Sequence, residues 1–161
     1  MPDTVHIRHL EPGYCIATWD GVLIQIWRGP ATLERTQKWQ EIGRSFLSER
    51  SGTVCSSLSI VDSRSPAPSE KVRLAMATSF NALAAGMRRH IVLGDGSALR
   101  SSLVRGVGLT LSLFSSAPLR LEFPASIDEA ALILAREMSP DAGGVEGLKA
   151  AVSRLRSHLD D

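Results

Sequence analysis

The sequence predicts an α/β fold, with a mixed sheet of about five to six strands covered by helices. Residues 5–10 alternate with a period of two, and the pair Asp20-Gly21 between the runs at residues 14–19 and 22–27 is typical of a tight β-hairpin. After Pro30, segments with helical periodicity alternate with short apolar runs, which favours parallel strands joined by helices. With 161 residues, of which 43% are hydrophobic, the chain is long enough to form one packed domain.

The opening segment is predicted to contain three strands, at residues 5–10, 14–19 and 22–27. The second and third strands form the antiparallel hairpin. In the third strand one face is wholly apolar, and the other is mixed because it contains Gln25, so we expect a sheet covered unequally on its two sides. Residues 33–50 are predicted to form a helix, because Trp39 and Phe46 recur at helical spacing and Thr32 is suited to cap its start.

Capping residues locate most of the later helices. Ser69 and Ser97 are each suited to the N-cap position, and Ser126 with Glu129 three residues later forms a capping box. The remaining expected elements are strands at residues 53–61, 90–93 and 119–123, and helices at about 69–87, 97–114, 126–138 and 145–159.

The last predicted helix follows Gly143-Gly144 and has a single apolar stripe. We therefore expect residues 1–140 to form the domain and residues 141–161 to form an additional C-terminal amphipathic helix. Whether this helix packs on the domain or on a partner is open.

Charge and targeting signals limit the classes of partner. Eighteen Lys and Arg residues against seventeen Asp and Glu residues give a net charge of +1, which does not favour nucleic acid or an anionic membrane as partner. No apolar run approaches the ~20 residues of a membrane helix, and the start lacks the features of a secretory signal. We therefore expect a cytoplasmic protein without a membrane span, with Cys15 and Cys55 as buried, reduced thiols.

No specific catalytic or metal-binding motif is present. The turn at residues 94–97 has a leucine, Leu99, where the dinucleotide fingerprint requires a further glycine, and the P-loop lysine is absent. The histidines are scattered at four positions without metal-ligand spacing. We expect no metal and no cofactor, and an enzyme that uses Asp62, His90 or Asp95 is the least favoured interpretation.

The loop that follows the predicted strand at residues 53–61 is the first candidate site. In open α/β sheets, ligands and partners bind outside the carboxyl ends of the strands, and this loop lies there, just ahead of a helix. A phosphate on its serine would add ~1.5–2 negative charges at this position. The alternative is that these polar residues only form hydrogen bonds within the loop. The candidate residues are Asp62, Ser63, Arg64, Ser65 and Ser69.

An apolar pocket between the sheet and the helices is the second candidate site. Such a pocket would suit a lipid or another small apolar ligand. The same residue types also form an ordinary packed core, so both interpretations are open. The residues expected to line the pocket are Met76, Phe80, Leu83, Leu111 and Phe114.

The sequence resembles the STAS superfamily, and in particular its SpoIIAA-like branch, over residues 5–138. The resemblance is carried by Trp27-Arg28-Gly29-Pro30 after the third strand, by Ser59-Ile60-Val61-Asp62 ahead of a loop and helix, and by the predicted helix, strand and helix at residues 98–138. It implies a non-enzymatic regulatory module, which we expect to act through contacts with a protein partner. A second expectation is a homodimer formed through the exposed faces of the opening hairpin or the final helix.

The resemblance also bears on the loop. Classical members carry an Asp-Ser-Ser-Gly motif whose serine is phosphorylated by a partner kinase. Asp62 and Ser63 match its first two positions, whereas Arg64 and Ser65 replace the Ser-Gly that follows. SpoIIAA-like relatives commonly lack this switch, and small apolar ligands have been proposed for some of them.

Overall fold

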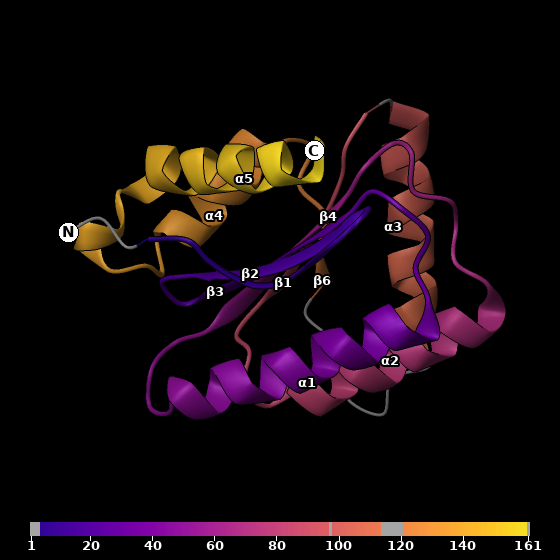
Figure 1. Ribbon diagram of the computed structural model, residues 1–161, viewed down its shortest axis with the longest axis horizontal. Helices are drawn as coiled ribbons and strands as arrows, with labels where there is room; N and C mark the ends of the chain where they lie inside the picture. Colours follow the sequence, from indigo (N-terminus) through magenta and orange to yellow (C-terminus); the bar gives the residue numbers. More distant parts are fainter. Residues whose placement is uncertain (1–3, 97, 114–120, 161) are drawn as a thin grey trace.

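The computed structural model describes residues 4–96, 98–113 and 121–160. Its centre is a six-stranded sheet whose strands lie side by side in sequence order (Figure 1). The first three strands are antiparallel, and the third to the sixth are parallel. This confirms the predicted α/β class. The strands are β1 (His6–Glu11), β2 (Tyr14–Trp19), β3 (Val22–Trp27), β4 (Ser56–Val61), β5 (His90–Gly94) and β6 (Leu121–Glu122).

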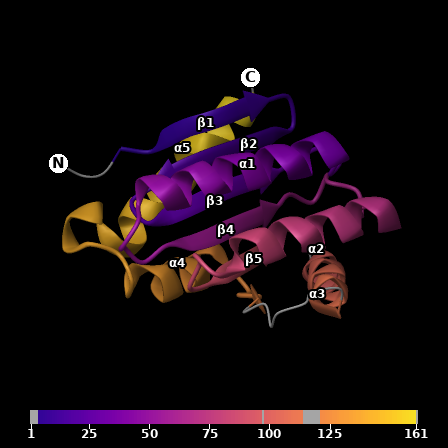
Figure 2. The ribbon, with the colours of Figure 1, turned by 90° about the horizontal axis from the view of Figure 1, so that it is seen from below.

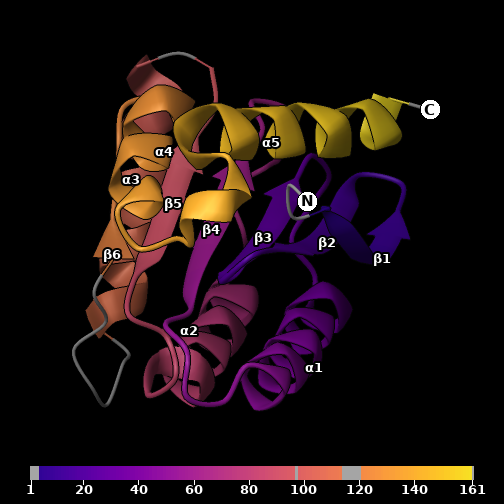
Figure 3. The same ribbon diagram turned by 90° about the vertical axis from the view of Figure 1, so that its left-hand side faces the viewer.

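Helices cover both faces of the sheet. In Figure 3, α4 and α5 lie on one side of the strands and α1 and α2 on the other, and Figure 2 looks onto the side of α1 and α2. The helix α3 stands beside β5 and runs across the direction of α1 and α2 (Figure 1). The helices are α1 (Leu33–Glu49), α2 (Glu70–Ala84), α3 (Ala98–Leu113), α4 (Ile127–Ala135), the 3-10 turn η1 (Pro140–Ala142) and α5 (Gly144–Asp160).

The hydrophobic core is divided into two parts by the sheet. Along β3, Ile24 and its alternate neighbours face the core under α4 and α5, whereas Leu23 and Trp27 face the core under α1 and α2. All six residues of β3 are buried. The expectation of an unequally covered sheet was wrong, because Gln25 forms hydrogen bonds to neighbouring side chains and so is buried like its apolar neighbours.

The local signals in the sequence correspond to observed hydrogen bonds. Thr32, Ser69 and Ser126 each accept a hydrogen bond from the backbone N–H three residues later, at 3.2, 3.3 and 3.2 Å. β2 and β3 pair along all six residues around Asp20-Gly21, where Asp20 adopts a φ of 47°. The hairpin and these three helix starts are therefore confirmed.

Several element ends differ from the expected ones. α2 ends at Ala84 rather than near residue 87, because the chain turns at Gly86, where an added Cβ would lie 2.7 Å from Leu47 of α1. α4 ends at Ala135 rather than near residue 138. Glu137, just after it, accepts hydrogen bonds from Ser56 at the start of β4 and from Arg89 just before β5. β4 starts three residues later than expected, β5 includes Gly94, and β6 has two residues. Ser97, Phe114 and Leu119 lie outside the described residues.

The segment expected as a C-terminal extension packs on the sheet. Leu148, Val152 and Leu155 of α5 are buried in the same core as Ile24. Within the described part of the chain, no helix is long and apolar enough to cross a membrane. Cys15 and Cys55 are buried free thiols, and burial raises the pKa of Cys15 to about 11.

Candidate functional site

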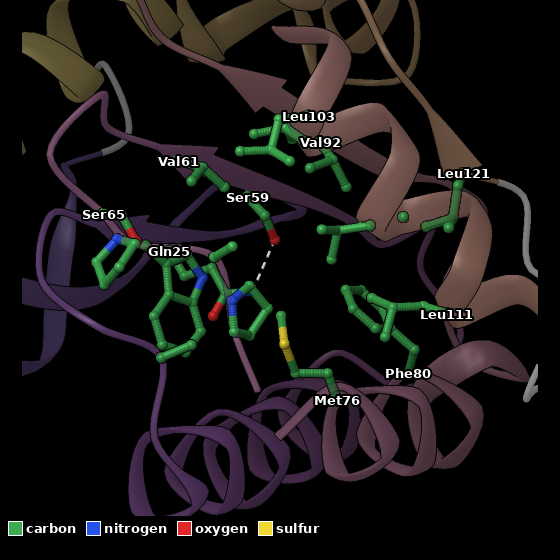
Figure 4. A pocket seen from close by; sticks show the side chains of 18 residues that line it. Gln25, Ser59, Val61, Ser65, Met76, Phe80, Val92, Leu103, Leu111 and Leu121 are labelled. Atoms are coloured by element: carbon green, nitrogen blue, oxygen red, sulfur yellow. Dashed lines mark hydrogen bonds between the residues drawn. The ribbon is translucent and has the colours of Figure 1, made fainter. Parts of the chain in front are cut away.

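An apolar pocket lies on the face of the sheet covered by α1, α2 and α3 (Figure 4). Its volume is about 70 Å³. The sheet, α2, α3 and the loop after β4 surround it. Leu103 of α3 lines the pocket and is 46% exposed, so it marks the place where the pocket reaches the surface.

The floor of the pocket is one row of residues across the sheet. Gln25 of β3 pairs with Ser59 of β4, and Ser59 pairs with Val92 of β5. Because side chains alternate along a strand, the residues two positions further on, Trp27 and Val61, lie on the same face and also line the pocket. The strand order therefore brings together residues from distant parts of the sequence.

The two helices provide apolar walls. Met76 and Phe80 are four residues apart on α2, and Val104, Val107 and Leu111 recur at three- and four-residue spacing on α3. These spacings place each set on one side of its helix. Figure 4 shows Met76, Phe80 and Leu111 pointing toward the same cavity.

A chain of hydrogen bonds lies in the floor of this apolar pocket. The Tyr14 hydroxyl donates to Oε1 of Gln25 at 3.0 Å, and Nε2 of Gln25 donates to the Ser59 hydroxyl at 2.7 Å. All three side chains are buried. Burial raises the pKa of Tyr14 well above its usual value, so its hydroxyl stays protonated and acts as a donor. The Tyr14 hydroxyl also lies 3.4 Å from the carbonyl oxygen of Arg35, but its contact with Gln25 is shorter, so Gln25 is its principal acceptor and the Gln25 amide turns its oxygen toward Tyr14.

The residues expected to line an apolar pocket divide into three groups. Met76, Phe80 and Leu111 do line it. Leu83 does not, because it packs toward α1, where an added Cβ on Gly43 would lie 2.6 Å from Leu83 Cδ1. Phe114 lies outside the described residues.

The loop after β4 holds Asp62 between two arginines. Arg28 donates to Asp62 at 3.1 Å, and Arg64 donates to it through its backbone N–H at 3.0 Å and through its side chain at 3.3 Å. Partial burial acts to raise the pKa of Asp62, but the hydrogen bonds from Arg64 and Arg28 outweigh it and hold that pKa below its usual value. Ser63 is exposed at the surface.

The two candidate sites meet at Ser65. Its side chain is buried and donates to the carbonyl of Gly29 at 2.9 Å, and Ser65 and the next three residues line the pocket. Ser69 caps α2 and is not among the lining residues. The polar loop therefore forms one wall of the apolar pocket.

The end of α5 is joined to the same region by ion pairs. Arg28 bonds to Asp160 of α5 as well as to Asp62, and Arg156 of α5 bonds to Asp95 at 2.8 Å. Asp95 follows β5, so these contacts lie at the carboxyl ends of the parallel strands. Asp95, in the turn after β5, is thus paired with α5.

His90 lies beside the pocket without lining it. Its Nδ1 is 2.7 Å from the Ser57 hydroxyl, and its ring meets Phe80 edge-on at 5.1 Å between ring centres. Burial lowers the pKa of His90 to about 4, so the imidazole is neutral at pH 7.

The described lining of the pocket has no acidic or basic side chain. Its described lining residues include no Asp, Glu, Lys, Arg, His or Cys. Across residues 4–96, 98–113 and 121–160, no group of three or more His, Cys, Asp or Glu residues is arranged to hold a metal ion. The arrangement is suited to hold an apolar molecule and to orient it by hydrogen bonds.

We compared the chain with protein-family models, curated proteins and solved structures. None of them matches.

The sequence analysis missed the polar residues Gln25 and Ser59 in the pocket floor, Tyr14, which bonds to Gln25, and apolar lining residues such as Val92 and Val107. A signal was present, because Gln25 and Ser59 are polar residues inside otherwise apolar strands. Only the adjacency of β3 and β4, however, shows that they are partners.

Proposed function

We propose that this protein is a non-enzymatic, STAS-like binding module that holds a small apolar molecule in the pocket between β4, α2 and α3. The observation that carries this proposal is the pocket itself, which combines apolar walls with a few fixed polar groups, as small-molecule sites do. The absence of acids and bases from its described lining supports a binding role rather than acid-base catalysis. A cavity of about 70 Å³ that reaches the surface suits a short molecule or one end of a longer one.

Binding of a small probe tests this function. With the methionine methyl groups labelled with ¹³C, titration with 2-methyl-1-pentene is expected to shift the Met76 methyl signal, because Met76 lines the pocket. For a probe of this size we expect a Kd on the order of 1 mM. The Met138 signal is expected to stay in place, because Met138 packs in the core on the other side of the sheet.

A blocking variant provides the control for this titration. Val92→Phe adds bulk to the floor of the pocket and is expected to weaken binding at least ~10-fold by occupying the site. Leu132→Phe, at an exposed position of α4, is expected to leave binding unchanged. A Met76 signal that does not move at any probe concentration would contradict the proposed function.

A second candidate function is a protein contact beside the pocket, in the simplest case with a second copy of this chain. It is favoured by exposed leucines on α2 and α3, at positions 74, 103, 109 and 113. Sedimentation velocity is then expected to show self-association that increases with concentration and that Leu109→Ser weakens. A sedimentation coefficient that does not depend on concentration would contradict self-association, and the small-molecule function would be the remaining candidate.

A further inference from the structure

The polar residues in the pocket floor have hydrogen atoms left to donate. The Ser59 hydroxyl accepts from Gln25, and across the described residues no side chain or backbone group accepts the hydroxyl hydrogen of Ser59. The Gln25 amide has two N–H groups, of which one bonds to Ser59. One O–H and one N–H of adjacent residues therefore remain at the floor of the cavity.

These two donors lie where water is largely excluded. Gln25 is 2% and Ser59 is 4% exposed, and the surrounding walls are Trp27, Met76 and other apolar side chains. A buried donor without an acceptor costs free energy, whereas one that bonds to a bound molecule contributes both affinity and orientation. Each of the two oxygens already accepts one hydrogen bond, from Tyr14 to Gln25 and from Gln25 to Ser59, whereas the two remaining hydrogens have no acceptor among the described residues. The floor thus presents donors to a ligand.

We infer that the ligand of this pocket is an uncharged, mostly apolar molecule with one carbonyl oxygen, as in a ketone or an ester, and that Ser59 and Gln25 donate to that oxygen. The inference rests on the proposed small-molecule function and specifies its ligand class. A carboxylate fits less well, because none of the described lining residues is a cation that would offset the burial of its charge. A pure hydrocarbon would leave both donors without an acceptor.

A pair of probes with the same shape tests the inference. 2-Pentanone and 2-methyl-1-pentene differ in that a carbonyl oxygen replaces a methylene group. Their dissociation constants are measured on the whole chain from the Met76 methyl shift, and their ratio is compared between variants. Water solvates the ketone better than the alkene, so the ratio of the two dissociation constants in one protein also reflects this solvation. The readout is therefore the change in this ratio when a residue is substituted.

Removing one donor is expected to affect the ketone alone. Ser59→Ala is expected to weaken the binding of 2-pentanone about fivefold, which is the loss typical of one neutral hydrogen bond. The dissociation constant of 2-methyl-1-pentene is expected to change by less than about twofold. The matched control is Ser57→Ala on the same strand and face, since Ser57 bonds to His90 and does not line the pocket. This control is expected to leave the ratio unchanged. Thermal unfolding of each variant shows that it is folded at the temperature of the titration.

A second measurement needs no variant. The infrared C=O stretch of ¹³C-labelled 2-pentanone bound to the wild-type chain is expected at a lower frequency than in a hydrocarbon solvent, because the carbonyl accepts hydrogen bonds. If both probes bind but the stretch matches the hydrocarbon value, or if Ser59→Ala leaves the ratio unchanged, the inference is overturned and the proposed function stands. If neither probe moves the Met76 signal, the proposed function fails and the inference fails with it.

Discussion

Replacing Glu137 by alanine is expected to lower the free energy of unfolding by about 2 kcal/mol. The Glu137 side chain is only 8% exposed; its carboxylate accepts from Nε of Arg89 at 2.6 Å and from the Ser56 hydroxyl at 3.0 Å. These bonds join the segment after α4 to the starts of β4 and β5. The Arg89 side chain is 34% exposed and keeps its second ion pair, with Glu122, so the loss is smaller than for a fully buried pair.

Chemical denaturation of two further variants shows how much of the expected loss at Glu137 comes from its charge and how much from its burial. Glu137→Gln keeps an acceptor for Ser56 but loses the charge that pairs with Arg89, so an intermediate loss is expected. Glu146→Ala removes a carboxylate that is 84% exposed and 3.7 Å from Lys149, and is expected to cost less than about 0.5 kcal/mol. The importance assigned to Glu137 would be refuted if its alanine variant were as stable as Glu146→Ala.

Lowering the pH from 7.5 to 5 is expected to destabilise the fold by about 2 kcal/mol through His90 alone. Burial lowers the pKa of His90 from 6.5 to about 4. Between these values the unfolded chain binds a proton that the native chain does not. The stability that depends on neutral His90 is therefore fully present above pH 6.5 and is progressively lost as the pH falls toward 4.

Comparison with a variant isolates this histidine. His90→Gln removes the titrating group, so the difference in unfolding free energy between wild type and variant is expected to shrink by about 2 kcal/mol from pH 7.5 to pH 5. The control is Leu132→Gln, at an exposed position of α4, which removes no titrating group and is expected to keep the wild-type pH dependence. A difference between wild type and His90→Gln that does not change with pH would show that His90 is not held neutral by the fold.

Features encoded by neighbouring residues were predictable from the sequence. The hairpin at Asp20-Gly21 and the caps at Thr32, Ser69 and Ser126 depend on residues within a few positions of one another, and all are observed. The ends of α2 and α4 were not predictable. They depend on contacts across the fold, such as Gly86 against Leu47.

The candidate site was predictable only in part, for a related reason. Helical periodicity places Met76, Phe80 and Leu83 on one stripe of α2, but it does not show that Leu83 packs toward Gly43 of α1. The bond between Gln25 and Ser59 joins residues 34 positions apart, so it depends on the order of the strands. Periodicity alone does not determine that order.

Arg28 pairs with both Asp62 and Asp160, and so it connects the loop beside the pocket to the end of α5. Arg28 and Asp160 are 132 positions apart, and the same guanidinium holds the loop that walls the pocket. A molecule that binds preferentially when this loop is in place also favours the docked form of α5, because linkage between two sites is reciprocal. Occupation of the pocket by the proposed ligand is therefore expected to slow amide hydrogen exchange along α5.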